Sequence, residues 1–185
     1  MQNIYRHITN SALTALLVVI YLYAFNSSYA TNKTAIATGA WNNAQIWNPT
    51  GIPSSSDKAF INNGVTLTLS SNQSISEVTV HAGGTLNLSS GFTLTMSGAL
   101  IVNGTMNMNN GNITQNSSGS AFSIGSSGSF TWEPGTNTLA GATLFTRGVE
   151  NFSSTSTLII KKWYDYVNVP LGNVITGNFG NLTLN

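Results

Sequence analysis

The sequence contains no cysteine, and charged side chains make up only 6% of its 185 residues. Without cysteine the fold holds no disulfide, although small secreted domains commonly depend on them. Only two histidines are present, so the composition does not favour a zinc site of the Cys/His type. A stable fold of this composition must therefore depend on extensive ladders of backbone hydrogen bonds.

The few charges balance once the N-terminal leader is left out. The remaining basic residues are Lys33, Lys58, Arg147, Lys161 and Lys162, and the acidic residues are Asp57, Glu77, Glu133, Glu150 and Asp165. A neutral chain with so few charges has no electrostatic footprint for nucleic acid or for an anionic membrane surface. The surface must instead be covered by serine, threonine, asparagine and glycine.

The first thirty residues have the pattern of a secretory signal peptide. Arg6 and His7 precede an apolar run over 12–25, and Ser28-Tyr29-Ala30 supplies small residues at the two positions that a signal peptidase reads. The run is shorter than the roughly 20 residues of a membrane-spanning helix, which disfavours the alternative of a membrane anchor. We predict cleavage after Ala30 and a secreted, extracellular or cell-surface location.

Apolar residues recur in the remaining chain at intervals of 19 to 24 residues. Each member of the first series lies shortly after a glycine, inside a short alternation of apolar and polar residues; the series is Leu67, Leu86, Met106 and Phe130. Two further series are Ile61, Val80, Val102 and Ile124, and then Ile75, Leu94 and Ile113. Alternation indicates strands with one buried face, and a return at this interval indicates a chain that coils over itself.

One complete rung is expected to hold three short strands, at Thr85–Leu88, Phe92–Met96 and Ala99–Val102. Glycines at the corners, such as Gly91, Gly98 and Gly104, would supply backbone angles that tight turns demand. We predict an all-β fold, a parallel β-helix (β-solenoid) with rungs of about 19–24 residues, right-handed by the general preference of parallel crossovers.

The expected organisation is a signal peptide at 1–30, an N-terminal cap leading to the first rung at 31–63, and solenoid rungs at 64–185. Asn87 and Asn107 lie 20 residues apart at matching positions. They are either members of an amide ladder or two separate polar surface residues, and the sequence does not favour one over the other.

A cluster near the start of the mature chain resembles a known family. It consists of Trp41, Trp47, Gly51-Ile52-Pro53 and Asp57, followed by a glycine-led strand from Gly64. This pattern resembles the N-terminal start of β-helices in large secreted or surface proteins from the Bacteroidetes, a resemblance that implies architecture more than chemistry.

We expect the tryptophans of this cluster to pack over the end of the first rung, Pro53 to fix the turn into it and Asp57 to cap a turn. The alternative is a platform on which a sugar stacks against Trp41 and Trp47, since aromatic faces present a large rigid apolar area.

Candidate functional residues are few. Asp57 and Glu77 each lie seven residues before a repeat glycine, so they could share one corner of adjacent rungs. Two carboxylates about 5 Å apart suit a retaining glycosidase, and they could also hold calcium. The alternative is two solvated corner residues.

The aromatic residues Trp163, Tyr164 and Tyr166 follow two lysines and form either a glycan-contacting or protein-contacting ridge or a long rung corner that covers the rod. His81, the one histidine of the mature chain, is expected at a strand end in an exposed or half-packed position. No nucleophile elbow, phosphate loop or dinucleotide fingerprint is present, so we assign no catalytic residue, metal or cofactor.

The sequence thus favours a secreted, non-catalytic β-solenoid segment of a bacterial surface protein that serves as a spacer, an adhesion module or a glycan-contacting module. Its expected partners are surface or matrix polysaccharides, or other copies of itself through an open C-terminal rung. The alternative is the N-terminal part of a carbohydrate-active enzyme with catalytic rungs beyond Asn185. The strand-like ending at 179–185 leads us to expect a truncated chain.

Overall fold

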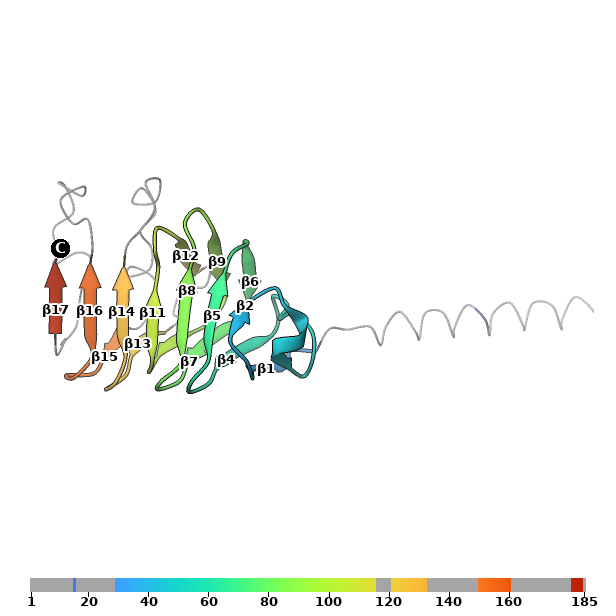
Figure 1. Ribbon diagram of the computed structural model, residues 1–185, viewed down its shortest axis with the longest axis horizontal. Coiled ribbons are helices and arrows are strands. Elements are labelled where there is room, and N and C mark those ends of the chain that lie inside the picture. Colours follow the sequence, from blue (N-terminus) through green and yellow to red (C-terminus); the bar gives the residue numbers. More distant parts are fainter. Residues whose placement is uncertain (1–14, 16–28, 116–120, 133–149, 161–180, 185) are drawn as a thin grey trace, which may run out of the picture.

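Short strands dominate the computed structural model, which describes residues 15, 29–115, 121–132, 150–160 and 181–184 (Figure 1). The strands of these residues form three sheets. The first sheet has the order β15 (Glu150–Phe152), β13 (Phe122–Ile124), β10 (Leu100–Val102), β7 (Glu77–Val80), β4 (Lys58–Ile61), β1 (Asn32–Ala35) and β3 (Trp47–Asn48). The second has the order β17 (Asn181–Leu184), β16 (Thr157–Ile160), β14 (Ser129–Trp132), β11 (Thr105–Asn107), β8 (Thr85–Leu88), β5 (Thr66–Leu69) and β2 (Gly39–Ala40). The third contains β12 (Asn112–Gln115), β9 (Thr93–Met96) and β6 (Gln73–Ile75).

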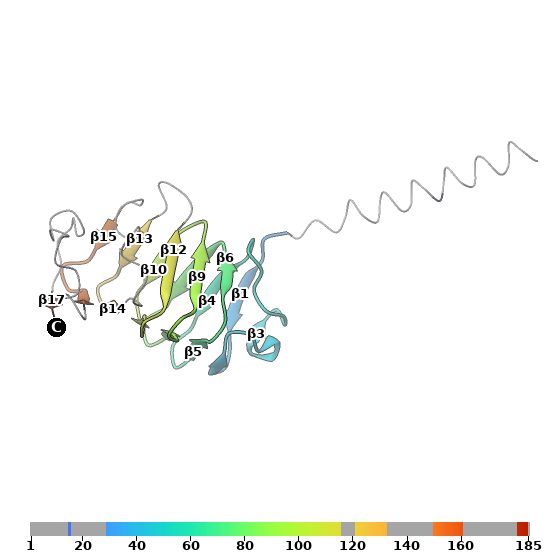
Figure 2. The ribbon, with the colours of Figure 1, turned by 90° about the horizontal axis from the view of Figure 1, so that it is seen from above.

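From β4 to β16, consecutive strands of the chain belong to different sheets, and the chain therefore winds. Strands β4, β5 and β6 form one coil, β7, β8 and β9 form the next, and β10, β11 and β12 form a third. Within the described ranges every strand pair is parallel except β1 with β3. Figure 2 shows the third sheet as a short row of stacked strands. The predicted fold class, an all-β parallel solenoid, is confirmed.

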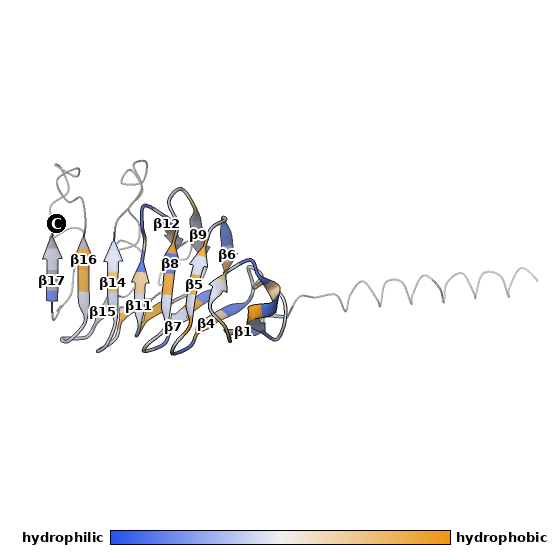
Figure 3. Ribbon diagram, viewed as in Figure 1, coloured by the Kyte–Doolittle hydropathy of each residue, from blue (hydrophilic) through white to orange (hydrophobic). Residues whose placement is uncertain are grey.

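The two longer series of apolar residues form internal columns, as predicted. In the second sheet Leu67 pairs with Leu86, Leu86 with Met106 and Met106 with Phe130. In the first sheet the same holds for Ile61, Val80, Val102 and Ile124. All these side chains are buried, and Figure 3 shows hydrophobic residues recurring in successive strands such as β5 and β8. The core is thus a stack of apolar layers between the sheets.

The third predicted series is wrong in part. Leu94 pairs with Ile113 as expected, but Ile75 pairs with Met96 rather than with Leu94. The cause is the corner after β8, which is two residues longer than the corner after β5, since Leu69 matches Leu88 whereas Gln73 matches Leu94. A slip of two residues keeps the same side of the strand inward, so Ile75 is still buried.

Corner glycines serve two different purposes. Gly64 and Gly91 have positive φ angles of 76° and 80°, which glycine adopts without steric cost. Gly84, Gly104 and Gly128 have no such angle, and a Cβ added at any of them would collide with backbone carbonyl oxygens, in most cases those of the preceding coil. The expectation that corner glycines supply turn angles therefore holds for Gly91 but is wrong for Gly98 and Gly104.

The N-terminal end of the stack is closed by an aromatic cap. Strand β2 leads through the short 3-10 helix η1 (Ala44–Ile46) to β3, which pairs antiparallel with β1. Trp41 and Trp47 are each only 1% exposed, and their rings meet edge to face with centroids 5.0 Å apart. The Trp47 Nε1–H donates to the Trp41 carbonyl oxygen at 2.9 Å.

This burial agrees with the packing role predicted for the two tryptophans and leaves no ring face on which a sugar could stack. Stacking of the coils already begins at β1 and β4, within the 31–63 region that the sequence assigned to the cap.

We predict that Gly104→Ala lowers the free energy of unfolding by about 1–3 kcal/mol, because the new methyl group overpacks the contact between two coils. Gly39→Ala is the matched control, since its Cβ would meet only the Ile46 side chain at an ordinary 3.6 Å. The control should stay within about 0.5 kcal/mol of the parent. Urea unfolding measures both, and equal losses would contradict the close-approach role of Gly104.

Candidate interaction surface

The outward side of the second sheet carries two straight rows of mostly small polar residues, with Ile159 as an apolar member and Thr131 only 8% exposed. Side chains alternate along each strand, so that Leu67 and Leu69 are buried while Thr66 and Thr68 face outward. Strand pairing aligns the first row as Thr66, Thr85, Thr105, Ser129, Thr157 and Asn181. It aligns the second row as Thr68, Asn87, Asn107, Thr131, Ile159 and Thr183. We call these two rows the Thr/Asn face.

The Thr/Asn face has the regularity of the underlying ladder. Neighbouring strands of a sheet lie about 4.8 Å apart, and residues two apart along a strand are about 6.6 Å apart. The strands of this sheet stand side by side in Figure 1, and none of them contains a charged residue within its bounds. Apart from Ile159, the face is therefore a periodic and uncharged array of hydroxyl, methyl and amide groups.

Two asparagines of the face form the amide ladder that the sequence left open. Asn107 Nδ2 donates to Asn87 Oδ1 at 2.9 Å, and the two residues are direct partners in adjacent strands. This bond uses one of the two N–H donors of Asn107, and the carbonyl oxygen of each amide has two lone pairs. The ladder thus holds both side chains in a fixed orientation and retains hydrogen-bonding capacity toward an outer ligand.

The carboxylate of Asp57 is buried, and four hydrogen bonds hold it. Its Oδ1 accepts from the backbone N–H and the hydroxyl of Thr31 at 2.8 and 2.7 Å. Its Oδ2 accepts from the backbone N–H and the hydroxyl of Ser54 at 2.7 and 2.8 Å. Burial by itself raises the pKa of Asp57, but these hydrogen bonds outweigh it and lower the pKa from 3.8 to about 2. The predicted capping of a turn by Asp57 is confirmed.

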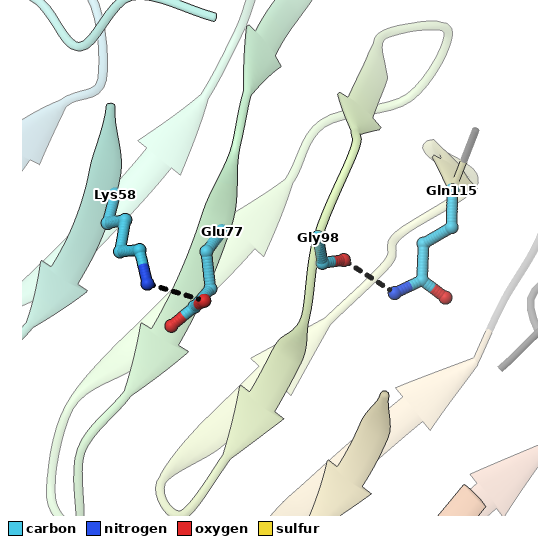
Figure 4. Close-up of polar contacts among 4 residues, drawn as sticks. All are labelled: Lys58, Glu77, Gly98 and Gln115. Atoms are coloured by element: carbon cyan, nitrogen blue, oxygen red, sulfur yellow. Dashed lines mark hydrogen bonds and ion pairs between the residues drawn. The ribbon is translucent and has the colours of Figure 1, made fainter. Parts of the chain in front are cut away.

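Glu77 has a different partner. It lies opposite Lys58 in adjacent strands, and Lys58 Nζ approaches Glu77 Oε2 at 3.0 Å (Figure 4). Asp57 instead neighbours Ser76, whose N–H donates to the Asp57 carbonyl oxygen at 2.9 Å. Asp57, just before β4, and Glu77, the first residue of β7, thus lie at the start of adjacent paired strands but one residue out of register, because a glycine count does not fix strand register. Among the described residues, no three acidic, histidine or cysteine side chains are grouped so that they could hold a metal ion.

The remaining candidate residues from the sequence are three aromatic residues and His81. Trp163, Tyr164 and Tyr166 fall in 161–180, outside the described residues. His81 is exposed, and its ring stacks on Phe60 with centroids 6.0 Å apart, which agrees with the half-packed role expected for it.

Sequence reasoning missed Gln115, which is 1% exposed and stands next to Met96 in an internal column. Its Nε2 donates to the carbonyl oxygens of Gly98, drawn in Figure 4, and of Ala121 at 3.1 and 3.5 Å. The sequence pattern could have predicted this burial, because strict alternation from Ile113 places Gln115 on the inner face of the strand. This glutamine connects two corners, which gives it a structural role.

Comparison of the chain with protein families, with curated proteins and with solved structures found no match. Among the described residues no helix has both the length and the apolar character needed to cross a membrane.

We predict that acid weakens the fold partly through Asp57. A carboxylate whose pKa is lower in the folded state than in the unfolded state stabilises the fold at pH values above 3.8. This contribution to the free energy of unfolding, about 2 kcal/mol, is lost as the pH falls toward about 2. Asp57→Asn should therefore lower stability at pH 7 and change it little at pH 2. Urea unfolding across this pH range measures the difference, and a deficit that does not depend on pH would contradict the assignment.

Proposed function

We propose that this chain is a secreted, non-catalytic β-solenoid segment of a bacterial surface or extracellular protein, and that its Thr/Asn face contacts neutral polysaccharide. The signal-peptide pattern supports export. The Trp-Trp-Pro-Asp pattern, with its resemblance to Bacteroidetes surface proteins, supports a place within a larger extracellular protein.

The observation that carries the proposal is the periodic row of hydroxyl and amide groups on the second sheet. A neutral polysaccharide presents hydroxyl groups as donors and acceptors along an extended chain. Threonine hydroxyls and asparagine amides likewise both donate and accept, and the lack of charge on the sheet avoids desolvating ions against an uncharged ligand. Backbone ladders fix the positions of these groups, so little side-chain order is lost on binding.

A non-catalytic role is supported by Asp57 and Glu77, the two acidic residues whose side chains lie in the described part of the structure. Asp57 is held by four hydrogen bonds from Thr31 and Ser54, and Glu77 pairs with Lys58. The carboxylates of Asp57 and Glu77 thus each bind neighbouring residues of the chain. Glycoside hydrolysis instead needs two carboxylates that face one substrate.

The test is a glycan array of neutral and acidic polysaccharides, followed by affinity measurements on two matched variants. Thr85→Lys places a charge in the middle of the Thr/Asn face, and Thr95→Lys makes the same change at an outward, partly exposed position of β9 in the same coil. We expect Thr85→Lys to weaken binding about tenfold, or ~1.4 kcal/mol, and Thr95→Lys to leave it unchanged.

Equal effects of the two lysines would contradict the assignment of binding to this face. A parent chain that binds no polysaccharide on the array would reject the glycan contact and leave the spacer role. Trp163→Ala tests the aromatic stretch predicted from the sequence. Loss of binding in Trp163→Ala without loss in Thr85→Lys would move the contact to that stretch.

A further inference from the structure

The strand ladder places Thr31 directly beside Asp57. The first paired residues of β1 and β4 are Asn32 and Lys58, and the Lys58 N–H donates to the Thr31 carbonyl oxygen at 2.9 Å. The residues just before these strands, Thr31 and Asp57, are therefore neighbours. The Thr31 backbone nitrogen lies 2.8 Å from Asp57 Oδ1, and its hydroxyl oxygen lies 2.7 Å from the same atom.

Thr31 is also the residue that the predicted signal-peptide cleavage would make the first of the mature chain. We propose that the α-amino group released at Thr31 is bound by the Asp57 carboxylate, and that this ion pair closes the N-terminal end of the solenoid. In the cleavage, water adds across the Ala30–Thr31 peptide bond. Ala30 leaves with the leader as a carboxylate, and the Thr31 nitrogen takes up protons to become an ammonium group.

The carboxylate is oriented for this role. Asp57 is only 5% exposed, and Ser54 holds Oδ2 through its backbone N–H and hydroxyl, which directs Oδ1 toward Thr31. The nitrogen thus acquires its charge at hydrogen-bond distance, where a charge-assisted bond is shorter and stronger than a neutral one.

In the described part of the chain, other cations are engaged elsewhere. Lys58 pairs with Glu77 at 3.0 Å, and Lys33 Nζ donates to the carbonyl oxygens of Pro49 and Thr50. The nearly buried Asp57 carboxylate is held by neutral donors of Thr31 and Ser54, and the new ammonium group adds a cationic partner to them. The junction itself is accessible, since Tyr29 is 74% exposed and Ala30 is exposed as well.

The consequence is a fold that gains stability when the leader is removed. With the leader attached, Thr31 offers Asp57 only a neutral amide N–H. After cleavage the same contact is an ion pair that ties β1 to the turn before β4. This inference shares with the proposed function only the removal of the leader, and polysaccharide binding plays no part in it.

The experiment exports the full chain in two forms. One has the natural sequence, and the other has Gly-Ser inserted between Ala30 and Thr31, so that the mature protein keeps an amide at Thr31. Mass spectrometry identifies each mature N-terminus, and thermal unfolding is measured with and without Asp57→Asn. We expect Asp57→Asn to lower the melting temperature by at least about 5 °C more in the natural form.

Glu77→Gln is the matched control, because it removes a carboxylate that does not contact Thr31 and should cost the same in both forms. A second readout does not depend on a variant that folds. The bound α-amine of the natural form should be acetylated at least about tenfold more slowly than the displaced amine of the inserted form, since a neighbouring carboxylate raises the pKa of an amine by one unit or more. Equal Asp57→Asn losses, equal acetylation rates, or a mature natural chain that does not start at Thr31 would each overturn the proposal.

Discussion

Each coil of this protein is stable only against its neighbours, because parallel pairing between coils satisfies the backbone and buries the inward side chains together. A coil on its own would have two unpaired strand edges, and its apolar residues would be exposed to water. In the stack the same residues, such as Leu86 and Leu88 in β8, are fully buried. Stacking closes these edges, and stability in such architectures accumulates from contacts between adjacent repeats. No disulfide contributes, since the chain has no cysteine. The cap formed by Trp41 and Trp47 covers the N-terminal end of these ladders. Small residues at the corners allow adjacent coils to approach closely enough to pair.

The strands were predictable because alternation leaves a strong local signal. Leu67, Leu86, Met106 and Phe130 could be aligned by their neighbours alone, and so could the column that begins at Ile61. Corners were less predictable, because their length changes from coil to coil without a change in composition. The misplaced partner of Ile75 and the misaligned pair Asp57 and Glu77 both arose from counting residues across corners.

The candidate site, like the fold, was predictable from the sequence only in part. Asn87 and Asn107 could be placed at matching positions, but the whole Thr/Asn face could be recognised only after strand register was known. The partners of Asp57 were beyond sequence reasoning for another reason. Thr31 lies 26 residues from Asp57 in the chain, and no periodic pattern connects the residue before the first strand to a turn before the fourth. Buried Gln115 was overlooked because polar residues are expected outside.

Strand register in the second sheet survives while the chain between aligned residues grows. From Leu67 to Leu86 the step is 19 residues, and it reaches 28 from Phe130 to Leu158. The fold therefore separates the length of a coil from the alignment of its strands. Insertions between strands can therefore be accepted during evolution, while the pairing of the strands stays the same.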